Sequence, residues 1–205
     1  MKLIDLSHKI NFKTKSYPSD PDLIIKKEKN INDHGSLLHS IKFGTHMGTH
    51  LDSPAHIIEN GKTIDQFKLD SFIGTAVKVD IDSWEKVEQV KCIDGIIFET
   101  GWYKNFNYPE KFYDKKRPSI PMDLINVAIK LKIKFFGCDL PSIDMSGDKQ
   151  KPIHNLLLQN DIIIYESLNN LKMIKNCKKF QFIGLPLPFD RIEGSPVRAI
   201  AIIND

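Results

Sequence analysis

The stretch from His46 to His56 reads HMGTHLDSPAH, and it holds three of the chain's seven histidines together with an aspartate. Its four titratable residues all occupy even positions, so a straight strand would place them on one face; they are His46, His50, Asp52 and His56. At about 3.3 Å per residue, the first and last histidines would then lie about 33 Å apart, too far to share one metal ion. We therefore predict a strand end that enters a bent loop, with Gly44, Gly48 and Pro54 supplying the bends.

The residue types in this cluster suit a metal site. Neutral imidazole nitrogens and a carboxylate oxygen are ligands for zinc, manganese or iron(II). No cysteine lies nearby, which disfavours a purely structural zinc site, and two histidines with one carboxylate leave coordination positions open for catalysis. The alternative is a set of scattered surface histidines on a loop rich in Gly and Pro. Three histidines and an aspartate within eleven residues favour the ligand cluster.

A second group of polar residues lies about a hundred residues downstream. His154 stands at the head of an apolar helical turn, and Glu166 directly follows the apolar run 162–165. A glutamate at the end of a buried strand is costly unless it is paired or binds a metal. The alternative is an exposed Glu166 that caps a following helix, and the residues alone leave both interpretations open.

Short apolar and β-branched runs bounded by turn residues recur along the chain and predict strands. They cover residues 3–6, 23–26, 37–43, 75–81, 95–98, 134–138, 162–165, 180–185 and 197–203. Helical patterns are fewer and cover residues 122–131, 154–159 and 167–174. The dominance of strands predicts one α/β domain over residues 1–205, with a mixed β-sheet and a few helices rather than a strict βαβ repeat.

The composition excludes several classes of protein. The chain has 205 residues and a net charge of +3, with 29 cations spread among 26 anions, so it lacks the basic stripe that nucleic-acid binding needs. No run approaches the ~20 apolar residues of a membrane span, and the first ten residues do not form a signal peptide. Three cysteines without a CxxC pair predict reduced thiols and a cytoplasmic protein. No glycine-rich nucleotide-binding motif follows any predicted strand.

With both polar clusters in view, the chain resembles the putative cyclase family, which contains bacterial kynurenine formamidase and isatin hydrolase. The family motif HxGTHxDxPxH is met in full by residues 46–56, and a second motif is met by His154, two leucines and Glu166 twelve residues after the histidine. Shorter similarities run from end to end of the chain. They are LIDLSHKI at 3–10, TGW at 100–102, GCDLPSID at 137–144 and SPVRAIAI at 195–202.

The resemblance implies a swivelling β/β/α fold and a homo-oligomer, dimer or tetramer, that acts on a small molecule with the help of metal. It implies that the first metal is bound by His46, His50 and Asp52, and that Asp52, His154 and Glu166 hold a second. Two zinc ions per subunit are expected, with Mn²⁺ as the alternative. In the family the last histidine of the motif, here His56, donates and accepts protons.

The expected reaction is hydrolysis of an amide or formamide bond of the N-formylkynurenine type, a step of tryptophan catabolism. A metal-bound hydroxide would attack the carbonyl carbon, and His56 would hand a proton to the leaving nitrogen. Three alternatives stay open: a lactam hydrolase similar to isatin hydrolase, a non-catalytic metal-binding member of the family, and a domain with one structural metal.

One departure from the family bears on the substrate. Kynurenine formamidases carry a WPGD-like element whose tryptophan packs on the aromatic substrate, and the matching stretch here is Tyr17-Pro18-Ser19-Asp20. Tyr17 is an aromatic residue that is able to stack on a substrate ring, which makes it a candidate substrate-binding residue. The alternative is an aromatic side chain that closes a proline turn. The change from tryptophan leaves the kynurenine assignment open.

Overall fold

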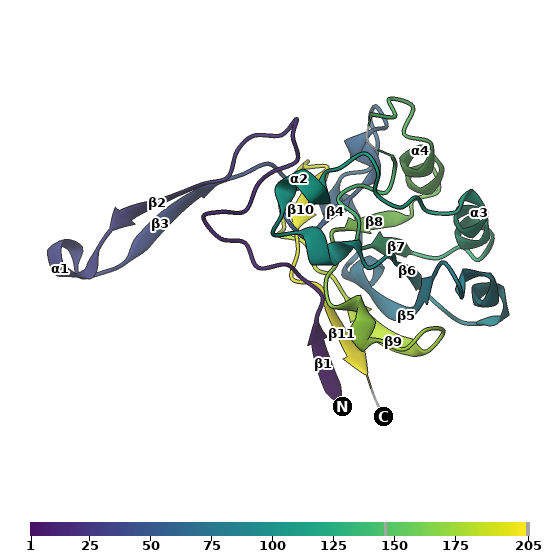
Figure 1. The fold of residues 1–205 in the computed structure, drawn as a ribbon. Coiled ribbons are helices and arrows are strands. Elements are labelled where there is room, and N and C mark those ends of the chain that lie inside the picture. The colour runs from purple at the N-terminus through teal and green to yellow at the C-terminus, as the bar shows by residue number, and fades with distance from the viewer. Residues whose placement is uncertain (146, 204–205) are drawn as a thin grey trace.

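The computed structural model describes residues 1–145 and 147–203, and its main element is a nine-stranded mixed sheet (Figure 1). The strands of this sheet are β1 (Lys2–Asp5), β4 (His50–Asp52), β5 (Ile73–Asp80), β6 (Gly95–Glu99), β7 (Phe135–Cys138), β8 (Ile163–Glu166), β9 (Lys179–Ile183), β10 (Gly194–Pro196) and β11 (Ile200–Ile203). Their order across the sheet is β1-β11-β9-β5-β6-β7-β8-β4-β10. Strands β5 to β8 are parallel, and the other neighbouring pairs are antiparallel.

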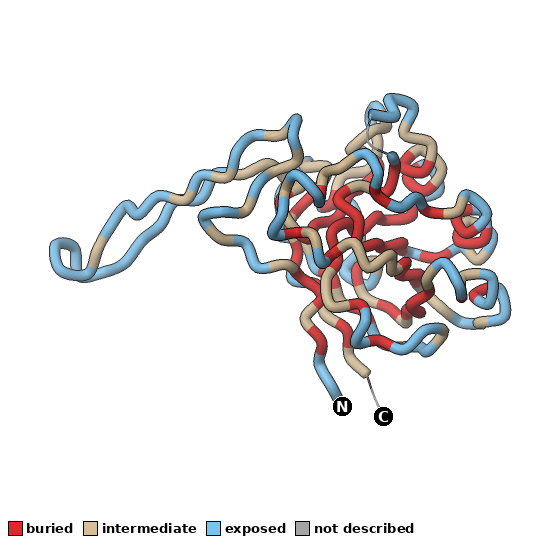
Figure 2. The backbone as a smooth tube through the Cα atoms, in the orientation of Figure 1, coloured by how far each residue is buried: buried red, intermediate tan, exposed pale blue. Residues whose placement is uncertain are grey.

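The central strands are hydrophobic on both faces, because helices cover one face and the curled sheet encloses the other. On β6, Ile96 and Phe98 face one apolar cluster while Ile97 faces a second, as the two-residue period of a strand requires. The first cluster includes the buried apolar residues of α3 (Met122–Lys130) and α4 (Pro152–Leu158). The second includes residues of β1, β11 and β9, the three strands at one end of the sheet. Figure 2 shows the buried backbone concentrated in this body.

A two-stranded arm projects from the body on the left of Figure 1. It consists of β2 (Ile24–Lys29) and β3 (Leu38–Lys42), joined at the tip by α1 (Ile31–His34), and its two strands form a sheet of their own. Gly35 ends α1 in the left-handed region, at φ 68°. None of residues 21–42 is buried, and the arm is drawn as exposed or half-exposed along its length in Figure 2. The described part of the chain therefore does not bury the arm against the body.

The predicted secondary structure is largely confirmed. All nine predicted strands and the helices over 122–131 and 154–159 have counterparts in the structure, with small differences at the ends. The helix predicted over 167–174 was wrong: only a 3₁₀ turn, Leu171–Met173, forms there. The chain bends at Ser167 and Asn170, which both have positive φ values of 54° and 56°, and neither residue can continue a right-handed helix there.

Several elements were not predicted. They are β10, α1, α2 (Pro109–Phe112) and the 3₁₀ segments Pro54–His56, Ile64–Gln66, Leu69–Phe72, Trp84–Gln89 and Trp102–Asn105. Each spans six residues or fewer, which is too short for hydrophobic periodicity to reveal. Within the described part of the chain, no helix is long and apolar enough to cross a membrane.

Candidate metal centre

Strands β4 and β8 place three ionisable side chains on one face of the sheet. The strands pair antiparallel, with His50 opposite Glu166 and Leu51 opposite Tyr165. Because side chains alternate along a strand, Leu51 and Tyr165 enter the apolar core, while His50, Asp52 and Glu166 share the other face. These three residues are only 1–3% exposed. Glu166 is therefore a buried group that faces other charged groups, and the alternative of an exposed helix cap is wrong.

A hydrogen bond fixes the orientation of each of the two buried histidine rings. His50 Nδ1 lies 2.8 Å from the carbonyl oxygen of Gly48, which can only accept, so Nδ1 carries the proton. Gly48 lies in the left-handed region at φ 64°, as the predicted bend requires. His154 Nδ1 lies 2.7 Å from Asp144 Oδ2 and donates to it in the same way. In both rings Nε2 is the nitrogen that faces the carboxylates. Hydrogen bonds with Asp144, Asp52 and Glu166 outweigh burial and raise the pKa of His154 well above its usual value, so a metal that binds through this ring must displace its proton.

Asp144 also holds the start of the helix that carries His154. The backbone N–H groups of Ile153 and His154 donate to its two oxygens at 2.9 and 3.0 Å. Burial alone would raise the pKa of Asp144, but hydrogen bonds from His154 and Ile153 outweigh burial and keep that pKa below its usual value. Asp144 is thus an ionised carboxylate that positions His154 from behind.

The spacing of the buried donors fits a bound metal. His50 Nε2 lies 3.5 Å from Asp52 Oδ1 and 3.4 Å from Glu166 Oε2, and His154 Nε2 lies 3.6 Å from Asp52 Oδ2 and 3.4 Å from Glu166 Oε1. Two ligands about 2.1 Å from a tetrahedral ion lie about 3.4 Å apart. Asp52 Oδ2 is buried without a hydrogen-bond partner, which is costly for a carboxylate unless a cation faces it. The residues present therefore fit a divalent metal.

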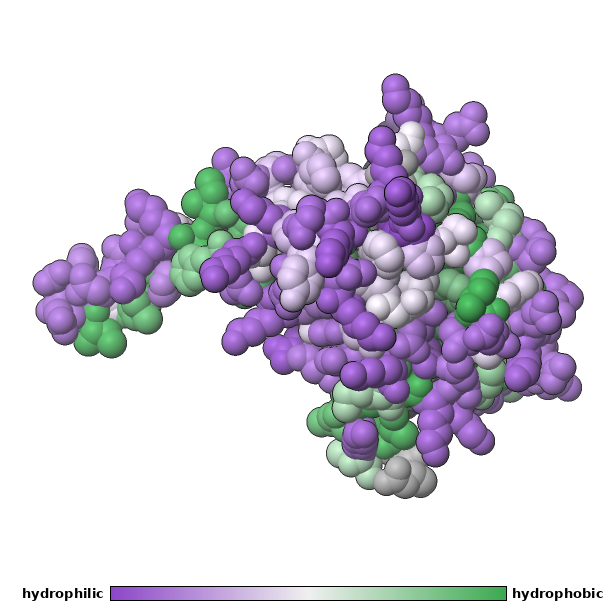
Figure 3. All heavy atoms as spheres, viewed as in Figure 1, coloured by the Kyte–Doolittle hydropathy of each residue, from purple (hydrophilic) through white to green (hydrophobic). Residues whose placement is uncertain are grey.

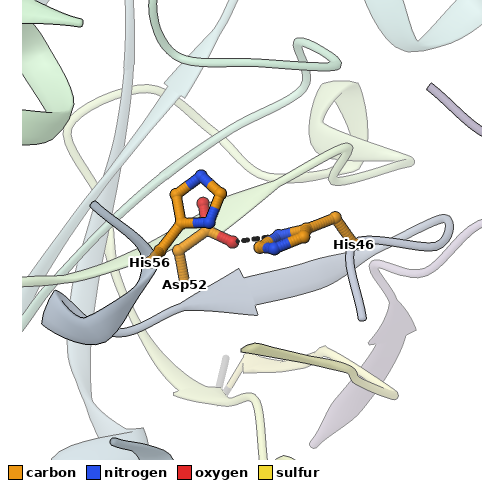
Figure 4. A group of neighbouring side chains, drawn as sticks. All are labelled: His46, Asp52 and His56. Atoms are coloured by element: carbon orange, nitrogen blue, oxygen red, sulfur yellow. Dashed lines mark hydrogen bonds and ion pairs between the residues drawn. The ribbon is translucent and has the colours of Figure 1, made fainter. Parts of the chain in front are cut away.

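His46, on the loop that precedes β4, contacts the same carboxylate from within the same cavity. Its Nδ1 lies 2.7 Å from Asp52 Oδ1 (Figure 4). Its Nε2 lies 3.4 Å from Glu193 Oε1. Burial would lower the pKa of His46, but Asp52 and Glu193 outweigh it and raise that pKa to about 10. The metal-free ring is therefore protonated at neutral pH, and metal binding through this ring must release the proton.

His56 lies beside the metal ligands after a sharp turn. Pro54 begins the 3₁₀ segment Pro54–His56, and the turn brings the His56 ring to 4.3 Å from the His46 ring and 5.5 Å from the His154 ring, between centroids. Burial lowers the pKa of His56 to about 4, although Asp52 opposes the shift. The ring is thus neutral at pH 7 and able to accept a proton.

These residues line a cavity of about 340 Å³. Its wall also includes Tyr17, which packs edge-to-face on Tyr113 with the ring centroids 5.5 Å apart. The structure thus brings together all seven residues singled out in the sequence as metal-binding, catalytic or substrate-binding. The cavity is large enough for a small aromatic molecule.

Sequence reasoning missed three residues that act on the site. Asp144 orients His154, Glu193 faces His46, and Lys151 Nζ lies 3.2 Å from His56 Nε2. Asp144 lies in the family-like stretch GCDLPSID, and Glu193 lies two residues before the stretch SPVRAIAI. Both carboxylates could therefore have been predicted as candidate site residues. No sequence signal marks Lys151 among the chain's many lysines.

Replacing Asp144 with asparagine tests its positioning role. We expect metal affinity to fall about 10–100-fold, because the amide no longer fixes the His154 tautomer as a carboxylate does. Competition with a chelating dye measures the affinity, and Asp148→Asn, an exposed residue of the same cavity wall, is the matched control. Equal metal affinity in the Asp144 variant and the wild type would contradict the role.

The comparisons with known proteins agree with this geometry. The family model described as "Putative cyclase" matches residues 4–145. The chain belongs to the putative cyclase family. An uncharacterized protein of Methanocaldococcus jannaschii is 37% identical over 99% of this chain and 100% of its own length. The kynurenine formamidase of Salinibacter ruber is 28% identical over 98% of this chain and 97% of its own length.

Solved structures share the fold from end to end. An isatin hydrolase bound to the product analogue thioisatinate has a TM-score of 0.86 at 22% identity, over 100% of this chain and 93% of its own. A predicted metal-dependent hydrolase from Bacillus stearothermophilus has a TM-score of 0.76 at 18% identity, over 98% and 97%. The predicted family, the cyclase-like α/β fold and the class of metal-dependent hydrolase are thereby confirmed.

Proposed function

We propose that this cyclase-family hydrolase cleaves the C–N bond of a formamide or related amide on an aromatic amine, as N-formylkynurenine carries. The observation that supports this most is the neutral, half-buried His56 ring beside a donor set that fits a divalent metal, in a cavity with an aromatic wall. The kynurenine formamidases at 24–29% identity support the same substrate class. With such a substrate the enzyme would act in tryptophan catabolism.

The metal would be held by the residues that face Asp52. We propose two zinc ions per chain, with Mn²⁺ as the alternative, because Asp52 and Glu166 each direct one oxygen at His50 and the other at His154. The first position would use His46, His50 and Asp52, and the second Asp52, His154 and Glu166. When bound, such metals polarise a carbonyl oxygen and make water a nucleophile at neutral pH.

His56 moves the proton in this reaction. The ring takes a proton from the attacking water as the new C–O bond forms, and it gives that proton to the nitrogen as the C–N bond breaks. The products are a carboxylic acid, formic acid for a formamide, and the free amine. Tyr17 and Tyr113 provide an aromatic wall on which the amine's ring would pack.

A substrate panel tests the proposal. We expect the zinc-loaded enzyme to release formate from N-formylkynurenine or 2-formamidobenzoate and to hydrolyse isatin more slowly. The loss of the absorbance of the N-formyl compound measures the first reaction, and the absorbance change on opening of the isatin ring measures the second. Faster turnover of isatin would support the lactam alternative, which Tyr17 in place of the family's tryptophan keeps open. No turnover of any panel member, with metal bound, would favour the non-catalytic alternative.

The exposed arm supports a homodimer as the assembly. A two-stranded hairpin is at best marginally stable alone in water, yet the arm has apolar side chains exposed at Ile24, Ile31, Leu37, Leu38 and Ile41 (Figure 3). The arm lies between Asp20, in the cavity wall, and His46. A second copy of the chain that packs on the arm would therefore also hold both ends of this wall in place.

The double replacement of Ile24 and Ile41 by lysine tests the assembly. We expect the molecular mass from light scattering to fall from that of a dimer to that of a monomer of 23.5 kDa. The control is Leu69→Lys, which changes an exposed apolar residue of the body. A wild-type chain that is already monomeric would contradict the proposal.

The cysteines bear on where the protein works. Cys92, Cys138 and Cys177 are free thiols, which supports the proposed cytoplasmic location.

A further inference from the structure

Lys151 has an unusual backbone conformation at the start of α4. Its φ and ψ are 43° and 57°, in the left-handed region, and it precedes Pro152. This region is rare for residues other than glycine, and a following proline restricts the backbone further toward extended conformations. Such a conformation costs energy and persists only where the surroundings hold it. Here it accompanies a Lys151 side chain that reaches into the cavity beside His56.

The ammonium group of Lys151 has no acidic partner. Its Nζ lies 3.2 Å from His56 Nε2, and within residues 1–145 and 147–203 no carboxylate lies within 4.0 Å of it. The cavity wall does include Asp20 and Asp148, so acids are nearby but are not paired with it. A half-buried cation without a counterion is unfavourable. An anion brought by a ligand would remove that cost.

The position of Lys151 relative to the chemistry indicates where such an anion would lie. The His56 ring contacts Lys151 through Nε2, and its centroid lies 4.3 Å from that of His46 and 5.5 Å from that of His154. The nitrogen that takes a proton from His56 must lie within hydrogen-bond distance of that ring. An anionic substituent a few bonds from this nitrogen would then reach Lys151 Nζ.

We propose that Lys151 binds an anionic group, a carboxylate in particular, that the substrate carries close to the leaving nitrogen. The enzyme would accordingly select N-acyl amines that are acids over neutral ones. This inference rests on the proposed function, because it names the substrate class of the same site. A charge-assisted hydrogen bond of this kind is expected to change affinity or kcat/KM about 10–100-fold.

A binding experiment that needs no turnover tests the proposal first. Benzenesulfonate, an anion that coordinates zinc weakly, and methyl phenyl sulfone, its neutral analogue, are titrated into the zinc-loaded full chain by calorimetry. In Lys151→Met we expect the Kd of the anion to rise at least 10-fold and that of the sulfone to stay unchanged. Lys149→Met is the matched control, since it removes an exposed lysine from the same wall. An unchanged Kd for the anion, or an equal effect in both variants, would overturn the proposal.

A kinetic experiment separates this role from simple positioning of His56. The substrates are 2-formamidobenzoate and its methyl ester. We expect Lys151→Met to lower kcat/KM about 10–100-fold for the acid and less than 3-fold for the ester. An equal loss for both would make Lys151 a positioning residue for His56 and overturn the proposal. If the wild type hydrolyses neither compound, the proposed function fails, and the calorimetric result alone decides the role of Lys151.

Discussion

Replacing His56 with alanine is expected to lower kcat about 10²–10⁴-fold and to leave the metal content unchanged. The reason is that the His56 ring is neutral and, among the described residues, makes no ion pair with a carboxylate, so its loss removes proton transfer without removing a close ligand contact. His46, by contrast, lies 2.7 Å from Asp52 and is a predicted ligand. Steady-state kinetics and elemental analysis on the same preparation measure the two quantities.

The control for His56→Ala is His39→Ala, which removes an exposed histidine of the arm. It is expected to keep both kcat and metal. A His56 variant that loses metal in proportion to activity would instead make His56 a metal ligand. This outcome needs testing because ligand atoms of His46, Asp52 and His56 lie within 4.8 Å of one another. A variant with nearly full activity would exclude His56 as the residue that transfers the proton.

Replacing Asp52 with asparagine is expected to abolish metal binding and, with it, turnover by more than about 10³-fold. Asp52 is 1% exposed and faces His46, His50 and His154 together. Desolvation raises the pKa of Asp52, but His46 and His50 more than offset it, and that pKa lies well below its usual value. The amide keeps the shape of the side chain but removes the charge that attracts a cation.

The Asp52 variant also makes a prediction about the fold. Because asparagine preserves packing against the neighbouring strands, the circular dichroism spectrum should remain that of the wild type. Asp65→Asn is the control, since that aspartate is exposed and does not line the cavity. Retention of two equivalents of metal by Asp52→Asn would contradict the shared-ligand role, and unfolding would point to a metal that is structural.

The sequence alone predicted the body of the sheet, because its strands are continuous apolar runs. Residues such as Ile96, Ile97 and Phe98 are hydrophobic in succession, and the structure buries them on both faces of the sheet. The bends in the metal motif were also foreseeable: Gly48 takes a positive φ, and Pro54 starts the 3₁₀ turn that returns His56 to the site.

The rest of the site depends on contacts between distant segments that no local pattern encodes. The register that sets His50 opposite Glu166 arises from the pairing of two strands whose residues lie 116 positions apart in the sequence. The contact of Asp144 with His154 likewise joins the start of α4 to the loop before it. Whether Glu166 faced solvent or the site was therefore undecided by its neighbours in sequence. Lys151 escaped notice for the same reason, since its contact with His56 joins residues 95 apart.

The exposed arm illustrates a different limit. The strands at 23–26 and 37–43 were predicted from β-branched and apolar residues, and these residues do form β2 and β3. The pattern could not show that the pair leaves the body, because an apolar residue that awaits a second chain has the same identity as one in a core. Only the absence of buried residues over 21–42 reveals it.

The most direct test of the central claim is a metal titration of the chelator-stripped protein, followed by turnover of an N-formyl arylamine. We predict no measurable turnover without metal, and a rise in kcat/KM that reaches its plateau at two equivalents of Zn²⁺ per chain, with elemental analysis giving the same number. A stripped protein that hydrolyses the substrate as fast as the loaded one would contradict the account.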